Sequence, residues 1–176
     1  MRNLVYYVAT SLDGFIAHED GSWEGFLPEG DHIEAYLSSL ERFDAVLMGR
    51  RTYEVGVQAG KTDPYPTMES FVFSTTMTES PDEKVTLVTN GAAERVRELK
   101  NSEGCDIYLC GGSDLASHLL REDLIDELAL KVHPFVMGKG IPLFSPATNP
   151  RTLRPKDREE YESGVVLQRF DFAPGA

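Results

Sequence analysis

Two turns built on glycine carry the clearest chemical signal in this sequence. Each turn follows a short apolar run, one ending at Gly49 and the other at the pair Gly111 and Gly112. Both patterns predict a buried strand that ends at a glycine, after which the chain enters a helix. The start of a helix presents unpaired N–H groups and the positive end of the helix dipole, which suits a phosphate. Because Arg50 and Arg51 follow the first glycine, the two turns together indicate a phosphate-rich ligand such as a dinucleotide.

Each part of this signal also has a plainer explanation. Adjacent arginines occur in solvated turns, and a Gly-Gly pair between a strand and a helix can be a tight turn alone. The pyrophosphate of a dinucleotide must come close to the backbone, and glycine allows this because it has no Cβ. The G-x-G-x-x-G fingerprint and the P-loop motif are both absent from the sequence. A dinucleotide would therefore bind here by another scheme.

Composition and charge narrow the possible functions. The chain has 176 residues, a net charge of −12 and a hydrophobic share of 41%. These values indicate one globular domain with a core of its own. The acidic balance argues against nucleic acid and against an anionic membrane surface as partners. It also means that an anionic cofactor must be held by a local basic patch.

The cysteines, histidines and apolar runs exclude further classes. The two cysteines, Cys105 and Cys110, are too few for a disulfide framework, and with four scattered histidines they give no zinc pattern. We therefore expect no metal. No apolar run approaches the roughly 20 residues that a membrane span needs, and the N-terminus lacks the plan of a signal peptide. We expect a cytoplasmic protein.

The spacing of apolar residues predicts an α/β domain. Strands are expected at residues 3–10, 45–48, 71–74, 85–88, 106–110, 126–133 and 164–172, and helices at residues 31–42, 52–57, 91–100 and 114–121. Strands that alternate with helices favour a mostly parallel sheet within a three-layer domain. The end of the chain supplies strands without helices, which favours antiparallel C-terminal strands at one edge.

Three local features carry more specific expectations. Asp31 followed by Glu34 resembles a capping box at the start of the first helix. Ser113 is a natural N-cap for the helix that follows the second glycine turn. The alternation of Leu128 with Val132 along the strand at residues 126–133 predicts that one face of this strand is exposed.

Four segments, taken together and in order, resemble one known family. Residues 9–17, 48–54, 108–113 and 126–144 are similar to segments of the dihydrofolate reductase superfamily. The first and the last are most similar to its riboflavin-biosynthesis branch, the reductase domain at the C-terminal end of the bifunctional deaminase-reductase (RibD). The resemblance implies a dihydrofolate reductase-like fold, with residues 1–176 as a single domain of this type. The zinc motifs of the deaminase half are absent, so we expect no bifunctional arrangement.

The resemblance implies an NADPH-dependent reductase and assigns residues to the parts of the cofactor. These residues are Ala9, Ile16 and Ala17 at the nicotinamide; Gly49, Arg50, Arg51 and Thr52 at the 2′-phosphate and pyrophosphate end; Ser74 and Thr75 along the adenosine; and Gly111, Gly112, Ser113 and Leu115 at the pyrophosphate. An arginine near the 2′-phosphate favours NADP over NAD because its planar guanidinium pairs with phosphate through two hydrogen bonds. The protein would orient the cofactor and keep the pocket dry.

The substrate side departs from the dihydrofolate reductase pattern. Those enzymes place a carboxylate on the first helix, and this position falls here near Ile33, with Asp31 and Glu34 close by as capping residues. Folate reduction is therefore not favoured. The riboflavin branch matches at Asp13, which we predict to be a catalytic, substrate-side group; the alternative is an ordinary Asp-Gly turn. We expect a small heterocyclic substrate, pterin-like or aminopyrimidine-like, with 5-amino-6-(5-phosphoribosylamino)uracil as one candidate.

Other side chains near the expected pocket carry weaker hypotheses. Lys139 and Lys131 are the basic residues near the matched closing segment, so few cations remain to hold a substrate phosphate. Trp23 and Phe26 could form a lid over the substrate ring, although packing in a surface loop would explain them equally well. His133 is expected to be a strand-end residue rather than a catalyst.

Two other functions stay open at this point. A non-catalytic NADP(H)- or nucleotide-binding protein would keep the pocket without the chemistry. An enzyme acting on a phosphosugar or a mononucleotide would use the two glycine turns for phosphate alone. We also expect a homodimer, formed as a sheet-edge contact through residues 128–132 and the apolar residues 136–137.

Overall fold

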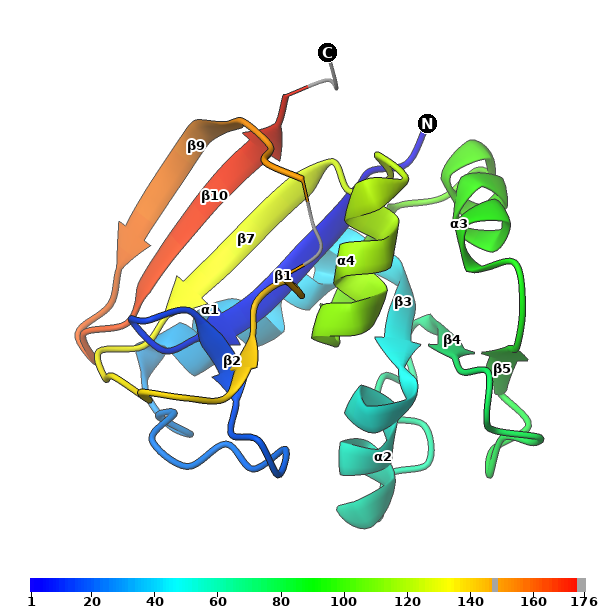
Figure 1. Ribbon diagram of the computed structural model, residues 1–176, viewed down its shortest axis with the longest axis horizontal. Coiled ribbons are helices and arrows are strands. Elements are labelled where there is room, and N and C mark those ends of the chain that lie inside the picture. Colours follow the sequence, from blue (N-terminus) through cyan, green and yellow to red (C-terminus); the bar gives the residue numbers. More distant parts are fainter. Residues whose placement is uncertain (147–148, 174–176) are drawn as a thin grey trace.

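The computed structural model describes residues 1–146 and 149–173, which form the strands and helices of an α/β domain (Figure 1). The strands are β1 (Leu4–Thr10), β2 (Phe15–Ala17), β3 (Phe43–Gly49), β4 (Glu69–Phe73), β5 (Val85–Val88), β6 (Asp106–Gly111), β7 (Glu127–Val132), β8 (Ile141–Pro142), β9 (Leu153–Glu160) and β10 (Val166–Phe172). The helices are α1 (Asp31–Ser39), α2 (Arg50–Gln58), α3 (Ala92–Asn101) and α4 (Ser113–Arg121), and a 3-10 turn, η1 (Leu40–Arg42), follows α1.

One large sheet organises these elements. Its strands lie in the order β5-β4-β3-β6-β1-β7-β10-β9, while β2 pairs with β8 in a small separate sheet. The strands from β5 to β7 run parallel to their neighbours, whereas β10 is antiparallel to both β7 and β9. The predicted fold class, a mostly parallel sheet with antiparallel C-terminal strands at one edge, is therefore confirmed.

Helices cover both faces of the sheet and complete the three layers. On one face, Val96 of α3 and Leu119 of α4 are fully buried against the strands. On the other face, Tyr53 of α2 is buried and Tyr36 of α1 is packed against the same cluster. Figure 1 shows α3 and α4 on the near side of the sheet and α1 on the far side. Because both faces are covered, the parallel strands carry continuous apolar runs.

The helix that follows the first glycine turn begins earlier than predicted. α2 starts at Arg50 rather than at residue 52, so Arg50 and Arg51 both lie in its first turn. The N-cap of α4 is Gly112, and Ser113 is already helical, so the predicted capping role of Ser113 is wrong. Its hydroxyl is therefore available for another contact.

The predicted capping box of the first helix is also wrong. Gly30 precedes α1, and no side chain caps the helix. The Asp31 carboxylate instead accepts a hydrogen bond of 2.7 Å from the backbone N–H of Glu162. This contact ties the start of α1 to the turn between β9 and β10.

The C-terminal strands correct two further predictions. β7 is mostly buried and lies between β1 and β10, so the half-exposed strand and the sheet-edge contact through residues 128–132 are both wrong. The homodimer itself stays a prediction. β9 is a strand that the sequence did not predict, because charged residues occupy both of its faces and leave no apolar alternation. Among residues 1–146 and 149–173, every helix is too short or too polar to cross a bilayer.

Candidate active site

The two glycine turns meet at the carboxyl edge of the parallel strands. β3 and β6 are neighbours, and their register places Met48 opposite Gly111. A Cβ added to Gly49 would lie 3.3 Å from the backbone nitrogen of Gly112, and one added to Gly112 would lie 3.3 Å from Thr52 Oγ1. The starts of α2 and α4 therefore come together around glycines that leave little room for side chains (Figure 1). Two converging helix N-termini suit an anionic group such as a pyrophosphate.

The two arginines at the start of α2 are held differently. Arg50 Nη1 donates to both carboxylate oxygens of Glu54, at 2.8 and 3.0 Å. Arg51 is exposed, and its side chain makes no hydrogen bond or ion pair with the described part of the chain. Arg51 is therefore the guanidinium that is free to pair with an added phosphate, whereas Arg50 is shared with a carboxylate.

Ser113 offers an unused hydroxyl at the same place. Its side chain is 6% exposed, and its Oγ is buried without a hydrogen-bond partner among the described residues. A buried polar atom without a partner costs free energy, on the order of 1–3 kcal/mol. A ligand oxygen at the start of α4 would satisfy it.

The predicted adenosine residues lie at the same edge, next to β3. Ser74 follows β4, whose last residue, Phe73, is paired with Gly49. Ser74 Oγ accepts hydrogen bonds from the N–H groups of Thr76, at 3.1 Å, and Met77, at 3.0 Å. The structure thus brings Ser74 to the edge, but its hydroxyl is engaged by its own turn. Thr75 is exposed in that turn.

A cavity of about 270 Å³ lies beside the carboxyl end of β1. Its walls come from β1, β2, α1, β7 and the loop before α1, through Ala9, Ile16, Trp23, Phe26, Leu27, Pro28, Ile33, Lys131 and His133. The predicted nicotinamide residues Ala9 and Ile16 are therefore brought together, while Ala17 pairs with Ile141 in the small sheet. Trp23 and Phe26 form part of the wall, and their role as a lid over the substrate stays a prediction.

The first helix presents an apolar side chain to this cavity. Ile33 lines it, and this is the position at which the resemblance places the carboxylate of dihydrofolate reductases. Leu115, the last of the predicted cofactor residues, belongs to α4 and is partly buried against the core. The geometry thus separates a polar edge at the glycine turns from a mainly apolar cavity.

Lys131 is the cation of this cavity. It lies next to Ala9 in the pairing of β1 with β7, and it is 7% exposed. Its Nζ lies 4.6 Å from the centre of the Tyr36 ring, a favourable cation–π contact. No carboxylate among the described residues pairs with it. Burial lowers the pKa of Lys131 to about 8 because the charged ammonium loses its hydration.

His133 directly follows β7 and contributes a neutral imidazole to the wall of the cavity. Its Nδ1 accepts a hydrogen bond of 3.2 Å from the N–H of Leu27, which assigns the proton to Nε2. Burial, and then the nearby Lys131 and His32, lower the pKa of His133 to about 4, so the ring is neutral at pH 7. His133 Nε2 is buried without a partner within the described residues, and it is therefore a spare donor.

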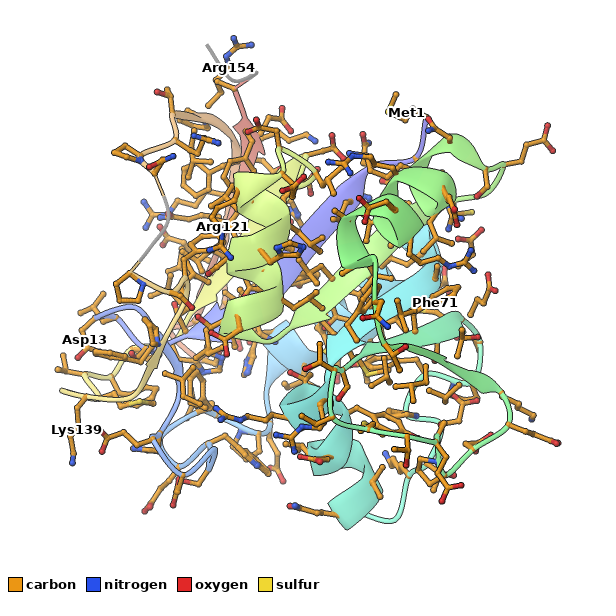
Figure 2. All side chains as sticks on the ribbon, turned by 45° about the vertical axis from the view of Figure 1, so that its right-hand side comes forward. Met1, Asp13, Phe71, Arg121, Lys139 and Arg154 are labelled. Carbon is orange, nitrogen blue, oxygen red and sulfur yellow. The ribbon has the colours of Figure 1, made fainter. Side chains whose placement is uncertain are left out.

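Asp13 has a structural role that is visible in the contacts. Its carboxylate accepts hydrogen bonds from the N–H groups of Met137, at 3.0 Å, and Gly138, at 2.7 Å. These bonds, that of Met137 first, lower the pKa of Asp13 to about 2. Asp13 is exposed and lies on the same side of the molecule as Lys139 (Figure 2), and it is not among the residues that line the cavity. Its catalytic role stays a prediction.

A comparison with models of known protein families shows to which family the chain belongs. The model of the RibD C-terminal domain family matches residues 2–167. This chain belongs to that family. Two Bacillus subtilis (strain 168) proteins resemble this RibD C-terminal domain, and both are uncharacterized. YwjB is 38% identical over 169 residues, covering 94% of this chain and 96% of YwjB. YyaP is 29% identical over 176 residues, covering 94% of this chain and 92% of YyaP.

Solved structures agree with this relationship. A protein of Shewanella sp. PV-4, described as a candidate riboflavin biosynthesis protein, has a TM-score of 0.83 and 28% identity, covering 98% of this chain and 99% of that one. A deaminase/5-amino-6-(5-phosphoribosylamino)uracil reductase of Thermotoga maritima has a TM-score of 0.72 at 19% identity; 98% of this chain is covered but only 57% of that enzyme. This second likeness concerns the fold alone.

Sequence reasoning undervalued Lys131 and His133. It treated the first as a nearby basic residue and the second as a strand end. The two-residue period of a strand places residues 127, 129, 131 and 133 on one face. A lysine and a histidine on a face that is covered by other elements would have indicated a functional site. That β7 lies inside the sheet, with that face covered, became clear only from the structure.

Proposed function

We propose that this RibD C-terminal domain is an NADPH-dependent reductase of a small heterocyclic substrate. The observation that carries the proposal is the position of the two helix starts, which meet around Gly49, Gly111 and Gly112 at the sheet edge that also opens the cavity. In open α/β sheets, ligands bind beyond the carboxyl ends of the strands. When bound, NADPH would supply a hydride from its nicotinamide ring.

The phosphate end of the cofactor would lie on the first turns of α2 and α4. Arg51 would pair with the 2′-phosphate, assisted by Arg50, and the Ser113 hydroxyl would donate to the pyrophosphate. Two features support the fit: the glycines leave the backbone open, and the buried Ser113 Oγ lacks a partner among the described residues. These groups bind and orient the cofactor without taking part in the chemistry.

The nicotinamide end would lie on the wall of the cavity. Ala9 and Ile16 would border the ring, with Ala17 next to them in the small sheet. The substrate ring would fill the cavity beneath Trp23 and Phe26, where apolar walls exclude water. Because Ile33 replaces a carboxylate on α1, folate reduction is not favoured. Among the cavity-lining residues Lys131 is the one cation, which favours a substrate without phosphate over a phosphoribosyl compound.

A calorimetric titration tests the cofactor. The wild type should bind NADPH much more tightly than NADH or AMP, because only NADPH carries the 2′-phosphate. Arg51→Ala should weaken the binding of NADPH by about tenfold or more, because one charge-assisted hydrogen-bonded pair is lost. It should leave the affinity for NADH nearly unchanged. Arg50→Ala should have the smaller effect, because Glu54 already shares this guanidinium. Arg158→Ala on the exposed strand β9 is the matched charge control.

Other results of this titration would argue against the proposal. Equal losses of NADPH and NADH affinity in Arg51→Ala would remove the 2′-phosphate assignment. AMP binding as tight as NADPH binding would favour a mononucleotide enzyme. Tight NADPH binding with no oxidation by pterins, aminopyrimidines or ring carbonyls would favour a non-catalytic binding protein. The predicted homodimer is a separate proposal that sedimentation velocity can test.

A further inference from the structure

Lys131 is a buried cation facing a mainly apolar cavity. We infer that Lys131 is a catalytic residue whose ammonium group holds a carbonyl oxygen on the substrate ring and gives that oxygen a proton when the carbonyl carbon is reduced. The inference rests on the proposed NADPH-dependent reduction and deepens it. It narrows the substrate to a planar ring ketone without a phosphate group.

The position of Lys131 matches this role. It pairs with Ala9 across β1 and β7, and Ala9 is the residue proposed to border the nicotinamide. Both residues line the same cavity, together with Ile16. A ring lying against Ala9 and Ile16 therefore has Lys131 at its edge. A proton donor at the edge of the ring can reach an oxygen without displacing the hydride donor.

A second buried lysine shows how this fold treats a lysine with a structural role. Lys100 is 5% exposed, and its Nζ donates to Asp126 Oδ2 at 2.5 Å and to the carbonyl of Leu124 at 2.8 Å. Lys131 is buried to a similar degree but has neither kind of partner within the described residues. Buried charges are ordinarily paired, so the missing acceptor at Lys131 points to a ligand atom.

The other groups on this face do not neutralise Lys131. Tyr36 of α1 faces its Nζ through the ring, and Tyr7 of β1 packs edge-on against Tyr36 at 5.4 Å. His133, which directly follows β7, is neutral at pH 7. Arg169 of β10 is already paired with two carboxylates of β9. The lysine therefore stays a cation whose N–H groups have no acceptor among the described residues, and burial lowers its pKa into the range where it can give up a proton.

In the proposed step the hydride and the proton come from two different donors. The carbonyl carbon takes the hydride from the reduced nicotinamide, and the π pair of the C=O bond moves onto oxygen. That oxygen takes a proton from Lys131 Nζ, which becomes a neutral amine, and the product is a secondary alcohol. The amine regains a proton from solvent when the product leaves. The ketone thus gains two electrons, which bound NADPH would supply as the hydride.

His133 supplies the second polar contact. Its Nε2–H is buried and unpartnered among the described residues, and it lines the cavity with Lys131. It would donate to another acceptor on the substrate ring and so orient the ketone toward the lysine. A ring with two acceptors and no anionic tail fits these two donors and the apolar walls.

Binding of a ring oxyanion tests the lysine without any turnover. The probe is the barbiturate monoanion, a planar pyrimidine whose charged oxygen cannot be reduced here, and Trp23 reports its binding because it is the only tryptophan and lines the cavity. Lys131→Met should weaken barbiturate by about tenfold to hundredfold, the loss of a charge-assisted hydrogen bond. Wild-type affinity should fall as the pH rises above about 8. Lys139→Met removes a charge from an exposed side chain nearby and should change nothing.

Reduction of isatin, a planar heterocyclic ketone, tests the proton transfer. In single turnovers with NADPH, Lys131→Met should lower the rate about hundredfold, the ordinary effect of removing a general acid. Lys131→Arg keeps the charge but does not release a proton readily, so it should bind barbiturate nearly as well as wild type and still react slowly. The wild-type rate should fall above pH 8, and the rates of both variants should not follow that fall.

The outcomes separate this inference from the proposed function. If NADPH binds tightly but barbiturate binds wild type and Lys131→Met equally, or binds neither, the inference about Lys131 is overturned. If barbiturate binding depends on Lys131 but wild type does not reduce isatin, the proton-transfer role is overturned. If NADPH itself does not bind while barbiturate still depends on Lys131, the proposed function fails and only the oxyanion site stands.

Discussion

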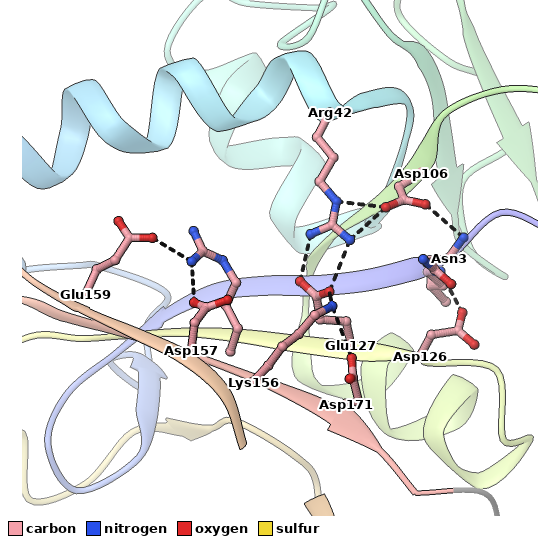
Figure 3. Close-up of polar contacts among 11 residues, drawn as sticks. Asn3, Arg42, Asp106, Asp126, Glu127, Lys156, Asp157, Glu159 and Asp171 are labelled. Atoms are coloured by element: carbon pink, nitrogen blue, oxygen red, sulfur yellow. Dashed lines mark hydrogen bonds and ion pairs between the residues drawn. The ribbon is translucent and has the colours of Figure 1, made fainter. Parts of the chain in front are cut away.

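Strand β7 buries a charged side chain near each end, on the same face of the sheet, but only one of the two charges is neutralised. Near the amino edge, Glu127 accepts from Arg42 Nη1 at 2.7 Å and from Lys156 Nζ at 2.6 Å. Figure 3 shows this pair of contacts within a larger network that includes Asp106. Near the carboxyl edge, Lys131 has no such partner among the described residues.

The two charges respond to burial in opposite ways. Burial alone would raise the pKa of Glu127, but the hydrogen bonds from Arg42 and Lys156 outweigh it and lower that pKa below its ordinary value. At Lys131 burial acts unopposed and lowers the pKa to about 8. The folded state thus favours the charged form of the glutamate and disfavours the charged form of the lysine.

The two edges of the sheet therefore differ in role. Ion pairs at the amino edge stabilise the fold, whereas polar groups at the carboxyl edge stay free to bind a ligand. The amino edge joins η1, β6, β7 and β9 through ion pairs that keep these elements together. At the carboxyl edge, the Arg51 guanidinium, Ser113 Oγ, the Lys131 ammonium and His133 Nε2 make no hydrogen bond or ion pair with the described residues. Unsatisfied groups cost stability, and they are retained where a ligand completes them.

Removing the carboxylate at the centre of the amino-edge ion pairs should have the largest effect on stability. Glu127→Gln removes the charge that Arg42 and Lys156 share and should lower the free energy of unfolding by about 3 kcal/mol. Urea unfolding measures the change. Glu160→Gln is the matched control, because the side chain of this glutamate is 69% exposed and, among the described residues, forms an ion pair only with Arg158. This variant should change stability by less than about 0.5 kcal/mol. A loss in Glu127→Gln no larger than in the control would show that the network does not stabilise the fold.

Removing the charge of Lys131 should change the free energy of unfolding in the opposite direction and by a smaller amount. Lys131→Met should raise the free energy of unfolding by about 2 kcal/mol at pH 7, because the folded state no longer buries a lone ammonium. Between about pH 8 and pH 10.5 the unfolded lysine binds more protons than the folded one, so wild-type stability rises with pH there and the advantage of the variant shrinks. Urea unfolding across this pH range checks the sign. A variant that is less stable at every pH would contradict the account.

The sequence predicted the parallel part of the fold well because those strands are buried on both faces and carry continuous apolar runs. It missed β9, whose residues 153–160 place charges on both sides and therefore look like a loop. It also took β7 for a half-exposed strand, because position in the sheet, and not alternation alone, decides whether both faces are covered.

The site was predictable where backbone chemistry defines it. Gly49 and Gly111 mark the ends of two strands, and the structure brings these turns together. The sequence could not show that Lys131 and His133 are strong candidates for function, because this depends on polar atoms that lack hydrogen-bond partners in the folded structure. The same holds for Arg50 and Arg51, which the sequence treats alike but which differ through the contact of Arg50 with Glu54.

Contacts between the nicotinamide ring and labelled isoleucine methyl groups test the central claim most directly. In NADPH-saturated protein, nuclear Overhauser measurements should connect the ring protons to the methyl group of Ile16, which lines the cavity. Ile107, fully buried near the amino end of β6, should show no such contact. Tight NADPH binding with ring contacts away from Ile16, or no binding at all, would contradict the claim that the glycine turns and the cavity form one cofactor site.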